Sequence, residues 1–399
     1  MYLNEKLERV IKIYLIRCIF FIFFILISQS SFGCDFHDFD SYQSRLTAKE
    51  IEWEIKTYLE KNEAIKRFYR LTPQVLYIGD LDHQQIDYIL KLNTNSPILP
   101  NKHSTYNGLK NIRIAIDPGH FGGSFAELEE RYVAIPAEMT KNNQPIRFHE
   151  GDLTYLTALE LQRLLENEGA VVLLTRSGIG QGAIKEDFFE WIKIHSDLIQ
   201  NVSSLSQVFR NYYNREDLKE RAKIINEFSP DVTIVIHYNS HLTDEEKKNK
   251  SLLTKINYNL AFIPGAFGAD ELNTIRDRYE FLRLIVTNQI NESLKLSEYV
   301  TGQFIRQLGI PLISEYEKTS YIDSACLIQK PGIYSRNLAL TRLVHSPVCY
   351  GETLVQNNQD EIYKLSEADT PVENIPCPKR VKAVAQAYYE GIKEYFKNR

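Results

Sequence analysis

Two histidines each follow an apolar run that is typical of a buried β-strand. Residues 112–123 read IRIAIDPGHFGG, so His120 comes after strand-like isoleucines and the Asp-Pro-Gly turn that ends them. Residues 232–236 read VTIVI, and His237 follows at once. Ligands of open α/β sheets bind beyond the carboxyl ends of parallel strands. We therefore expect the two imidazoles to converge at one sheet edge, where the pair of glycines after Phe121 leaves room for a ligand.

A carboxylate is available to complete a metal site. Catalytic zinc typically takes three protein ligands, drawn from His and carboxylate, and keeps one position open. Glu150 stands at the start of a Leu-rich helix, where it faces the positive end of the helix dipole. Glu130, in the connection from His120 to Glu150, competes for this role. The prediction is one Zn²⁺ held by His120, Glu150 and His237, which would polarise a carbonyl and lower the pKa of a water to about 7.

Further segments, taken in chain order, resemble the zinc-dependent N-acetylmuramoyl-L-alanine amidases of the Amidase_3 type. The matching positions are Asp117 to His120, Glu150, Thr175, Arg176, Arg221, Asn226, Asp231, His237, Asn239, Pro347, Glu352 and Asn357. A closing helix, predicted over residues 381–396, matches as well. The resemblance runs from about residue 110 to the end of the chain, apart from insertions. Tyr350-Gly351 before Glu352 and the long connection from His120 to Glu150 depart from the family pattern.

The resemblance implies a reaction and a role for each matched residue. His120, Glu150 and His237 would bind zinc, and Glu352 would be the general base and acid. Glu150 is preferred to Glu130 because a Leu-rich helix follows it directly, as the resemblance requires. The substrate would be peptidoglycan, cut at the amide between the lactyl group of N-acetylmuramic acid and L-Ala of the stem peptide. Asn239 is either a substrate contact or a loop residue bonded to the backbone.

Two other functions stay open at this point. A peptidoglycan-binding protein with the same fold but lost catalysis is one, and a zinc peptidase that cuts within the stem peptide is the other. The presence of all three expected zinc ligands and of the expected general base argues against the binding protein. The composition argues against a nucleic-acid partner, because the 399 residues carry a net charge of -5.

The repeated order of strand, loop and helix predicts an α/β fold with a mostly parallel twisted sheet flanked by helices. Residues 106–399 would form the catalytic domain, with inserts near 177–213 and 242–292. Residues 34–105 would form a small, mainly helical N-terminal segment of unknown role. Its predicted parts are a helix from the Thr47–Glu50 capping box to about residue 69, a strand at 75–78, a second helix at 82–92 and a linker at 97–101.

The second insert suggests a regulatory hypothesis. In some members of the resembled family, a helix inserted after the second zinc histidine blocks the metal until an activator protein removes it. Residues 270–284, rich in acidic and apolar side chains, are a candidate for such a helix. An insert that shapes the substrate groove is the equally weighted alternative.

The amino terminus resembles an export signal. Four basic residues precede or interrupt an apolar run at 19–27 (IFFIFFILI), which SQSSFGC follows. We expect residues 1–33 to be a signal peptide or lipoprotein signal, with lipid on Cys34 as one outcome, and the protein to act in the periplasm or cell envelope. An uncleaved anchor is disfavoured because the run is shorter than the ~18 residues that span a membrane.

The remaining cysteines, histidines and charged residues have structural interpretations. A disulfide among Cys326, Cys349 and Cys377 is permitted after export but not required. Asp117 would cap its turn or bond to a ligand histidine, and Arg221 would pair with a carboxylate where a helix meets the sheet. The histidines expected at the surface or in the core are His149, His195, His241 and His345.

Overall fold

The computed structural model describes residues 34–94, 108–197, 204–241, 249–317 and 319–399. The predicted leader (1–33) and linker (97–101) lie outside these ranges, as do residues 198–203 and 242–248 of the two inserts. The chain divides into two compact units, Met1–Ser41 and Tyr42–Arg399. No helix in the described part of the chain is long and apolar enough to cross a membrane. The second unit contains all strands of the described chain.

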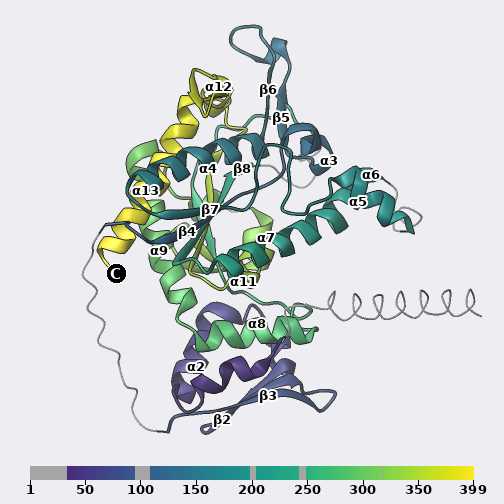
Figure 1. Ribbon diagram of the computed structural model, residues 1–399, viewed down its shortest axis with the longest axis vertical. Helices are drawn as coiled ribbons and strands as arrows, with labels where there is room; N and C mark the ends of the chain where they lie inside the picture. The colour runs from purple at the N-terminus through teal and green to yellow at the C-terminus, as the bar shows by residue number, and fades with distance from the viewer. Residues whose placement is uncertain (1–33, 95–107, 198–203, 242–248, 318) are drawn as a thin grey trace, which may run out of the picture. The chain divides into compact units, whose positions relative to one another are not determined.

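A seven-stranded sheet forms the centre of this unit, in the order β10-β11-β9-β12-β8-β4-β7 (Figure 1). The strands are β4 Arg113–Pro118, β7 Val171–Leu174, β8 Val232–Asn239, β9 Leu260–Ile263, β10 Cys326–Lys330, β11 Ile333–Arg336 and β12 Val348–Val355. The neighbouring pairs are parallel except β12 with β9 and β10 with β11. The mostly parallel sheet confirms the predicted fold class.

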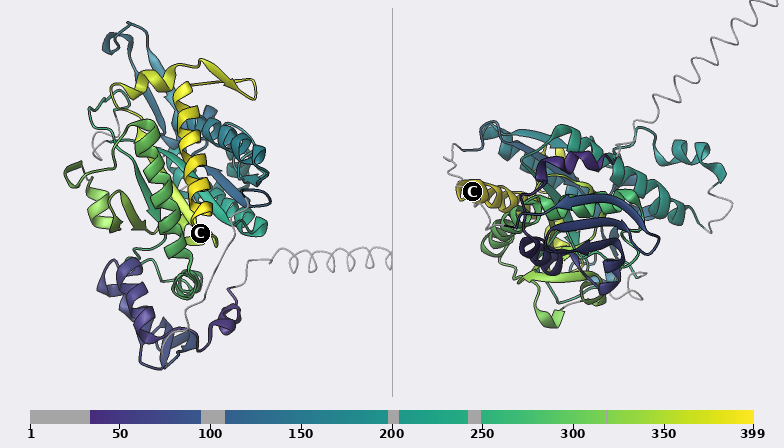
Figure 2. Two further views of the ribbon diagram at one scale, coloured as in Figure 1. Left: turned by 90° about the vertical axis from the view of Figure 1, so that its left-hand side faces the viewer. Right: turned by 90° about the horizontal axis from the view of Figure 1, so that it is seen from below.

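Helices cover both faces of this sheet. On one face α4 (Glu150–Asn167), α9 (Gln289–Gln303) and α13 (Lys379–Lys397) share a core with Ile114 and Ile116 of β4. Figure 2 shows α13 in yellow beside the green α9. On the other face α7 (Asn214–Phe228) and α11 (Ala339–Leu343) pack on Ala115. Burial on both sides explains why these strands read as continuous apolar runs in the sequence.

The N-terminal segment contains a small sheet as well as helices. The predicted capping box at Thr47 and Glu50 is present and starts α2 (Ala48–Glu54). The helix continues only to Leu59 and not to about residue 69 as predicted. The antiparallel strands β1 (Tyr69–Leu71), β2 (Val75–Asp80) and β3 (Gln85–Lys91) follow. The helix predicted at 82–92 is wrong, because this stretch pairs with β2 as β3. Its apolar residues Ile86, Tyr88 and Leu90 alternate with the period of a strand, which the sequence interpretation overlooked.

Buried charges brace the loop that follows β4. The Arg176 guanidinium, which is 1% exposed, donates hydrogen bonds to the backbone carbonyls of Pro118, Phe121 and Gly119. Arg221 pairs with Asp217 at 2.5 Å and with Asp117 at 3.5 Å, as the sequence predicted for a helix–sheet contact. Arg221 also donates to the carbonyl of Pro118. The loop is therefore held by two buried cations, Arg176 just after β7 and Arg221 on α7.

The three described cysteines of the sheet and its surroundings are free thiols. Cys326, Cys349 and Cys377 are buried and form no disulfide with one another. Burial raises the pKa of Cys326 to about 11 and that of Cys349 to about 12. These thiols are accordingly protonated core residues.

Glu54, the last residue of α2, gives a pH-dependent prediction. It is 7% exposed, its Oε1 atom has no hydrogen-bond partner among the described residues, and burial raises its pKa from 4.5 to about 7. The folded state therefore binds the proton more tightly, so stability falls as pH rises from 4.5 through 7. We expect Glu54→Gln to raise the free energy of unfolding by about 3 kcal/mol at pH 8 and by less than about 1 kcal/mol at pH 5.

Urea denaturation at the two pH values measures this difference. Glu52→Gln is the matched control, because Glu52 lies on the same helix in an exposed pair with Lys56. Such pairs contribute less than about 1 kcal/mol. Equal effects of Glu54→Gln at pH 5 and pH 8 would contradict the burial argument.

Arg176→Met tests the buried bracing of the loop after β4. Removing this cation takes away several buried, charge-assisted hydrogen bonds to backbone carbonyls, so we expect the free energy of unfolding to fall by about 3–5 kcal/mol. Arg163→Met is the control, because Arg163 is about half exposed and pairs with Glu160 on the surface of α4. The free energy of unfolding of Arg163→Met, measured by urea denaturation, should fall by less than about 1 kcal/mol. Similar losses for the two variants would show that the loop does not depend on Arg176.

Candidate active site

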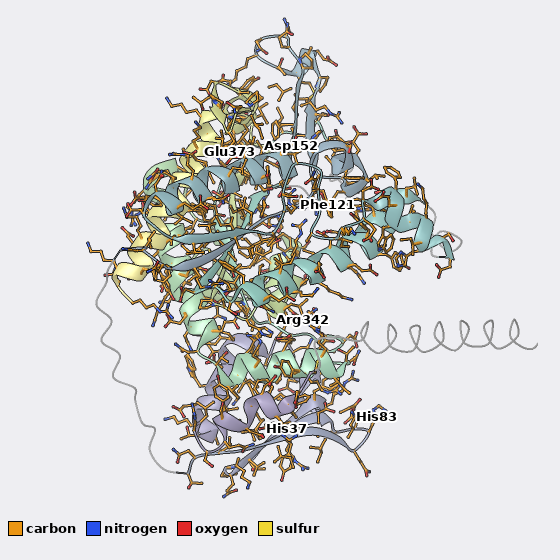
Figure 3. The ribbon with its side chains drawn as sticks, in the orientation of Figure 1. His37, His83, Phe121, Asp152, Arg342 and Glu373 are labelled. Carbon is orange, nitrogen blue, oxygen red and sulfur yellow. The ribbon has the colours of Figure 1, made fainter. Side chains whose placement is uncertain are left out.

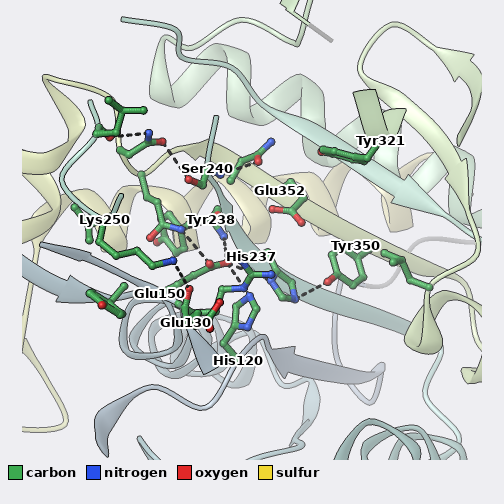
Figure 4. A pocket seen from close by; sticks show the side chains of 18 of the residues that line it. His120, Glu130, Glu150, His237, Tyr238, Ser240, Lys250, Tyr321, Tyr350 and Glu352 are labelled. Atoms are coloured by element: carbon green, nitrogen blue, oxygen red, sulfur yellow. Dashed lines mark hydrogen bonds and ion pairs between the residues drawn. The ribbon is translucent and has the colours of Figure 1, made fainter. Parts of the chain in front are cut away.

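Three neighbouring strands deliver side chains to one edge of the sheet. Gly119, next to His120, donates its backbone N–H to the carbonyl of Ile236 at 2.9 Å, which sets the end of β4 beside the end of β8. In the register of β12 with β8, Glu352 lies opposite His237. Glu150 arrives from another direction, as the first residue of α4. Figure 4 shows these four side chains around one pocket.

His120, Glu150 and His237 converge closely enough to share an ion. One ligand atom from each lies within 4.8 Å of the others. Oε1 of Glu150 is 3.2 Å from Nε2 of His120 and 3.3 Å from Nδ1 of His237. The two rings meet edge to face with centroids 4.7 Å apart. The structure thus brings together all three residues that the sequence predicted for the metal.

The second nitrogen of each imidazole has its own partner. Nδ1 of His120 is 2.8 Å from Oε1 of Glu129, whose other oxygen accepts the backbone N–H of Phe121 at 2.9 Å. Nε2 of His237 is 2.7 Å from the hydroxyl of Tyr350, and the two rings stack. If the nitrogen that faces Glu129 carries the proton, Nε2 of His120 presents its lone pair to the site.

Sequence reasoning missed Glu129 and Tyr350. Tyr350 was detectable, because it stands two residues before Glu352 on one strand and so shares its face of the sheet. Glu129 ends the short helix α3 (Ala126–Glu129) within the long connection between the two predicted ligands. No local pattern indicates that this connection folds back on His120.

Glu150 is held by neighbours on both of its oxygens. Oε1 accepts the backbone N–H of Tyr238 at 3.2 Å, and Oε2 accepts from the side-chain amide of Gln356 at 3.0 Å. Burial alone would raise the pKa of Glu150, but the two adjacent histidines hold it well below its usual range. The competitor Glu130 lies at the pocket but pairs instead with Arg210 at 2.7 Å.

Glu352 faces the same pocket in a different electrostatic setting. Burial raises its pKa to about 8, and the negative charge of Glu150 adds to this shift. No cation forms an ion pair with it within the described ranges. A carboxyl with a pKa near neutrality can take up and release a proton during a reaction.

A connection of unusual length closes one side of the pocket. Between α3 and α4 it forms the hairpin of β5 (Tyr132–Ile135) and β6 (Ile146–His149). Gly122, the first of the two glycines after Phe121, does not open this loop to a ligand as predicted. A Cβ atom on Gly122 would meet Asp152 at 2.2 Å, and one on Gly119 would meet the ring of His237 at 2.3 Å. The glycines serve close packing of the loop against α4 and β8.

The first insert supports the same loop through aromatic packing. Phe121, labelled in Figure 3, shares a buried cluster with residues of α5 (Phe188–Ile194) and of the helical turn Phe209–Tyr213. Its ring centroid is 5.0 Å from that of Phe209 and 5.5 Å from that of Tyr213. With α6 (Leu205–Val208), these elements form the helical part of the insert as far as the structure describes it.

The described residues of the second insert, 249–292, place no helix over the site. Its helix α8 (Ile275–Val286) contacts the N-terminal segment, where Arg278 pairs with Asp87 and Phe281 lies against Tyr69. None of its residues lines the pocket. The blocking helix hypothesised at 270–284 is therefore wrong for this structure. The alternative, an insert that shapes the groove, fits better, because Lys250 and Leu252 line the pocket.

The other predicted residues lie around the site in supporting roles. Asn239 lines the pocket, and its Oδ1 accepts the backbone N–H of Ser240 at 2.7 Å, which is compatible with either interpretation given above. Asp117 bonds to Thr175 and Arg221, and no bond joins it to a ligand histidine in the described structure. The four other histidines singled out in the sequence bond to residues outside the predicted metal site. The pairs are His149 with Asp152, His195 with Trp191, His241 with Tyr258 and His345 with Glu280.

The pocket is a cavity of about 330 Å³ with charged walls. Beside the acidic residues already described, it is lined by Arg131, Lys250 and Arg336, with Tyr321 and Tyr350 as aromatic surfaces. Lys250 donates to the backbone carbonyl of Glu130 at 3.0 Å. The arrangement can hold a cation between His120, Glu150 and His237, and a polar, partly anionic molecule beside Glu352.

Comparison with known proteins agrees with the resemblance in the sequence. The chain is 25% identical over 163 residues to the probable cell wall amidase LytH of Staphylococcus aureus, a match that covers 40% of this chain and 50% of LytH. The chain thus spans half the length of these curated relatives.

Among solved structures, the CwlD amidase of Clostridioides difficile in complex with the GerS lipoprotein has a TM-score of 0.43 at 19% identity, with 72% of this chain and 100% of that chain covered. Ami1 of Mycobacterium smegmatis, an N-acetylmuramyl-L-alanine amidase, has a TM-score of 0.43 at 13% identity, with 73% and 100% covered. The family model described as N-acetylmuramoyl-L-alanine amidase matches residues 114–394. The chain therefore belongs to the Amidase_3 family of N-acetylmuramoyl-L-alanine amidases.

Proposed function

We propose that this protein is a zinc-dependent N-acetylmuramoyl-L-alanine amidase. It would hydrolyse the amide between the lactyl group of N-acetylmuramic acid and L-Ala of the peptidoglycan stem peptide. The observation that carries the proposal is the approach of His120, Glu150 and His237 to within 4.8 Å beside Glu352. Membership of the family supports the bond and the metal.

The donor set fits zinc. Two imidazoles and one carboxylate are typical of catalytic zinc sites that keep a position open. The bonds from the outer nitrogens to Glu129 and Tyr350 match the contacts that orient metal-binding histidines. Burial would lower the pKa of His120, yet Glu150 and Glu129 raise it to about 9. The site therefore attracts positive charge strongly, as a cation site should.

The residues of this chain divide the chemistry between them. When bound, zinc would polarise the scissile carbonyl and make a water acidic. Glu352 takes the proton of the attacking water and returns it to the leaving nitrogen of L-Ala, which its pKa near neutrality favours. The buried walls of the pocket orient the amide and limit access of bulk water.

The two rival functions can be distinguished from the amidase by structure and by reaction products. A binding protein without catalysis would not need Glu352 in register with His237, so the register favours the enzyme. A zinc peptidase would use the same groups on a bond within the stem peptide. The products separate these two enzymes, since only the amidase gives free stem peptides that begin with L-Ala.

We also infer that the protein acts outside the cytoplasm, because its proposed substrate is there. The export signal in residues 1–33 and the lipid on Cys34 remain predictions made from the sequence. An activator protein that displaces α8 is not part of the proposal, because α8 does not line the pocket.

Digestion of purified peptidoglycan tests the proposed reaction. The wild-type enzyme loaded with zinc should release peptides with a free N-terminal L-Ala, identified by mass spectrometry. Glu352→Gln should slow this release by about 10²–10⁴-fold, because it cannot transfer the proton. Its zinc content, measured by atomic absorption, should stay at one ion. Release at the wild-type rate by the zinc-loaded variant would contradict the role of Glu352.

Glu129→Gln tests whether the outer hydrogen bond supports the metal. Loss of the negative charge beside Nδ1 of His120 should weaken zinc binding by about 10–100-fold, measured by competition with a chelator. Glu127→Gln is the control, because Glu127 lies on the same helix but pairs with the exposed Arg147. The prediction fails if the two variants bind zinc equally well.

A further inference from the structure

Arg336 is a cation of the pocket that has no carboxylate partner. It ends β11 and lines the cavity beside Glu352. Neither an ion pair nor a hydrogen bond of its guanidinium to another side chain occurs within the described parts of the chain. An unpaired, half-buried guanidinium is costly to desolvate, and such positions are commonly used to recognise an anion.

Two aromatic rings hold the guanidinium in place. Its Cζ atom lies 4.9 Å from the ring centroid of Phe262 on β9 and 4.7 Å from that of Tyr321 on α10 (Ser320–Ala325). Contacts of this kind stabilise a cation by about 0.5–2 kcal/mol without using its N–H donors. The side chain is therefore oriented in advance, and its donors stay available for a ligand.

The strand registers place Arg336 on the same face of the sheet as Glu352. Phe262 is paired with Tyr350 of β12 and with Tyr334 of β11. Paired residues share a face, and so do residues two apart along a strand. Arg336, Phe262, Tyr350 and Glu352 consequently lie on one face. Figure 4 shows Tyr321, which covers Arg336, beyond Glu352 as seen from His120.

We propose that Arg336 recognises a carboxylate of the stem peptide, so that the enzyme prefers substrates in which a carboxylate near the scissile amide is free rather than amidated. This inference rests on the proposed function. In the substrate of that reaction the sugar is neutral and the lactyl carboxyl is already an amide. The anionic groups nearest the scissile bond are therefore peptide carboxylates, which the planar fork of Arg binds with two parallel hydrogen bonds.

The other pocket cations are less suited to this task. Arg131 is exposed and contacts no ring, so binding would have to order its side chain at an entropic cost. Lys250 already donates to the carbonyl of Glu130. We therefore assign the selectivity to Arg336, which acts as a specificity residue apart from proton transfer.

Two synthetic muramoyl peptides provide the test. They are identical except that the α-carboxylate of the second, γ-linked residue is free in one and a carboxamide in the other. With the zinc-loaded enzyme, Arg336→Gln should raise KM for the acid substrate by about 10–100-fold and leave kcat nearly unchanged. KM for the amide substrate should change by less than about 2-fold. Arg336→Lys should restore part of the binding, because it keeps the charge without the fork.

Several results would overturn the assignment. Equal losses on the acid and amide substrates would mean a structural role, and a fall in kcat at constant KM would mean that Arg336 acts through Glu352. An acid-specific loss in the control Arg131→Gln, with none in Arg336→Gln, would place the recognition elsewhere. Thermal denaturation of each variant shows whether it is folded, and the Lys variant serves if the Gln variant is not.

Binding measurements separate this inference from the proposed reaction. If the wild-type enzyme releases no peptide from either substrate, the proposed function fails. Calorimetric titration with the same two compounds then tests Arg336 alone. Weaker binding of the acid compound only, in Arg336→Gln, would still support carboxylate recognition, whereas unchanged binding would refute it.

Discussion

One carboxylate oxygen, Oε1 of Glu150, lies against both imidazoles of the site, and the arrangement around it depends on that contact. A buried carboxylate is costly to desolvate unless it is paired and hydrogen-bonded. Here the start of α4, the backbone of Tyr238 and the amide of Gln356 stabilise it. Its charge raises the pKa of His120 and that of Glu352. The same oxygen thus prepares the cation site and keeps the neighbouring carboxyl ready to exchange protons.

The rest of the fold keeps this contact in place without using the reacting groups. Arg176 and Arg221 fasten the loop after β4 through its carbonyls, and Phe121 anchors it to the first insert. These contacts are buried, so they are screened little by solvent and can hold His120 in its left-handed backbone conformation (φ 60°). The rim of the pocket is formed by the β5–β6 hairpin together with Lys250 and Arg336.

The sequence predicted the part of the site that local patterns encode. Strands such as β8 are buried on both faces and read as apolar runs, so their ends, and with them His120 and His237, were predictable. Contacts that depend on tertiary folding were not. Glu129 reaches His120 through a connection with no regular pattern, and α8 binds the N-terminal sheet through Arg278 and Asp87, which are 191 residues apart. The strand β3 is a different case, because its apolar residues alternate with the period of a strand and this pattern was overlooked.

A crystal structure of the zinc-loaded protein, with anomalous diffraction collected at the zinc edge, tests the central claim most directly. The account predicts one zinc ion, located by a strong anomalous peak. This ion is bonded to Nε2 of His120, a carboxylate oxygen of Glu150 and Nδ1 of His237 at about 2.0–2.2 Å. A peak bound to Glu130 or His149 in place of Glu150, or no peak between the two histidines, would contradict it.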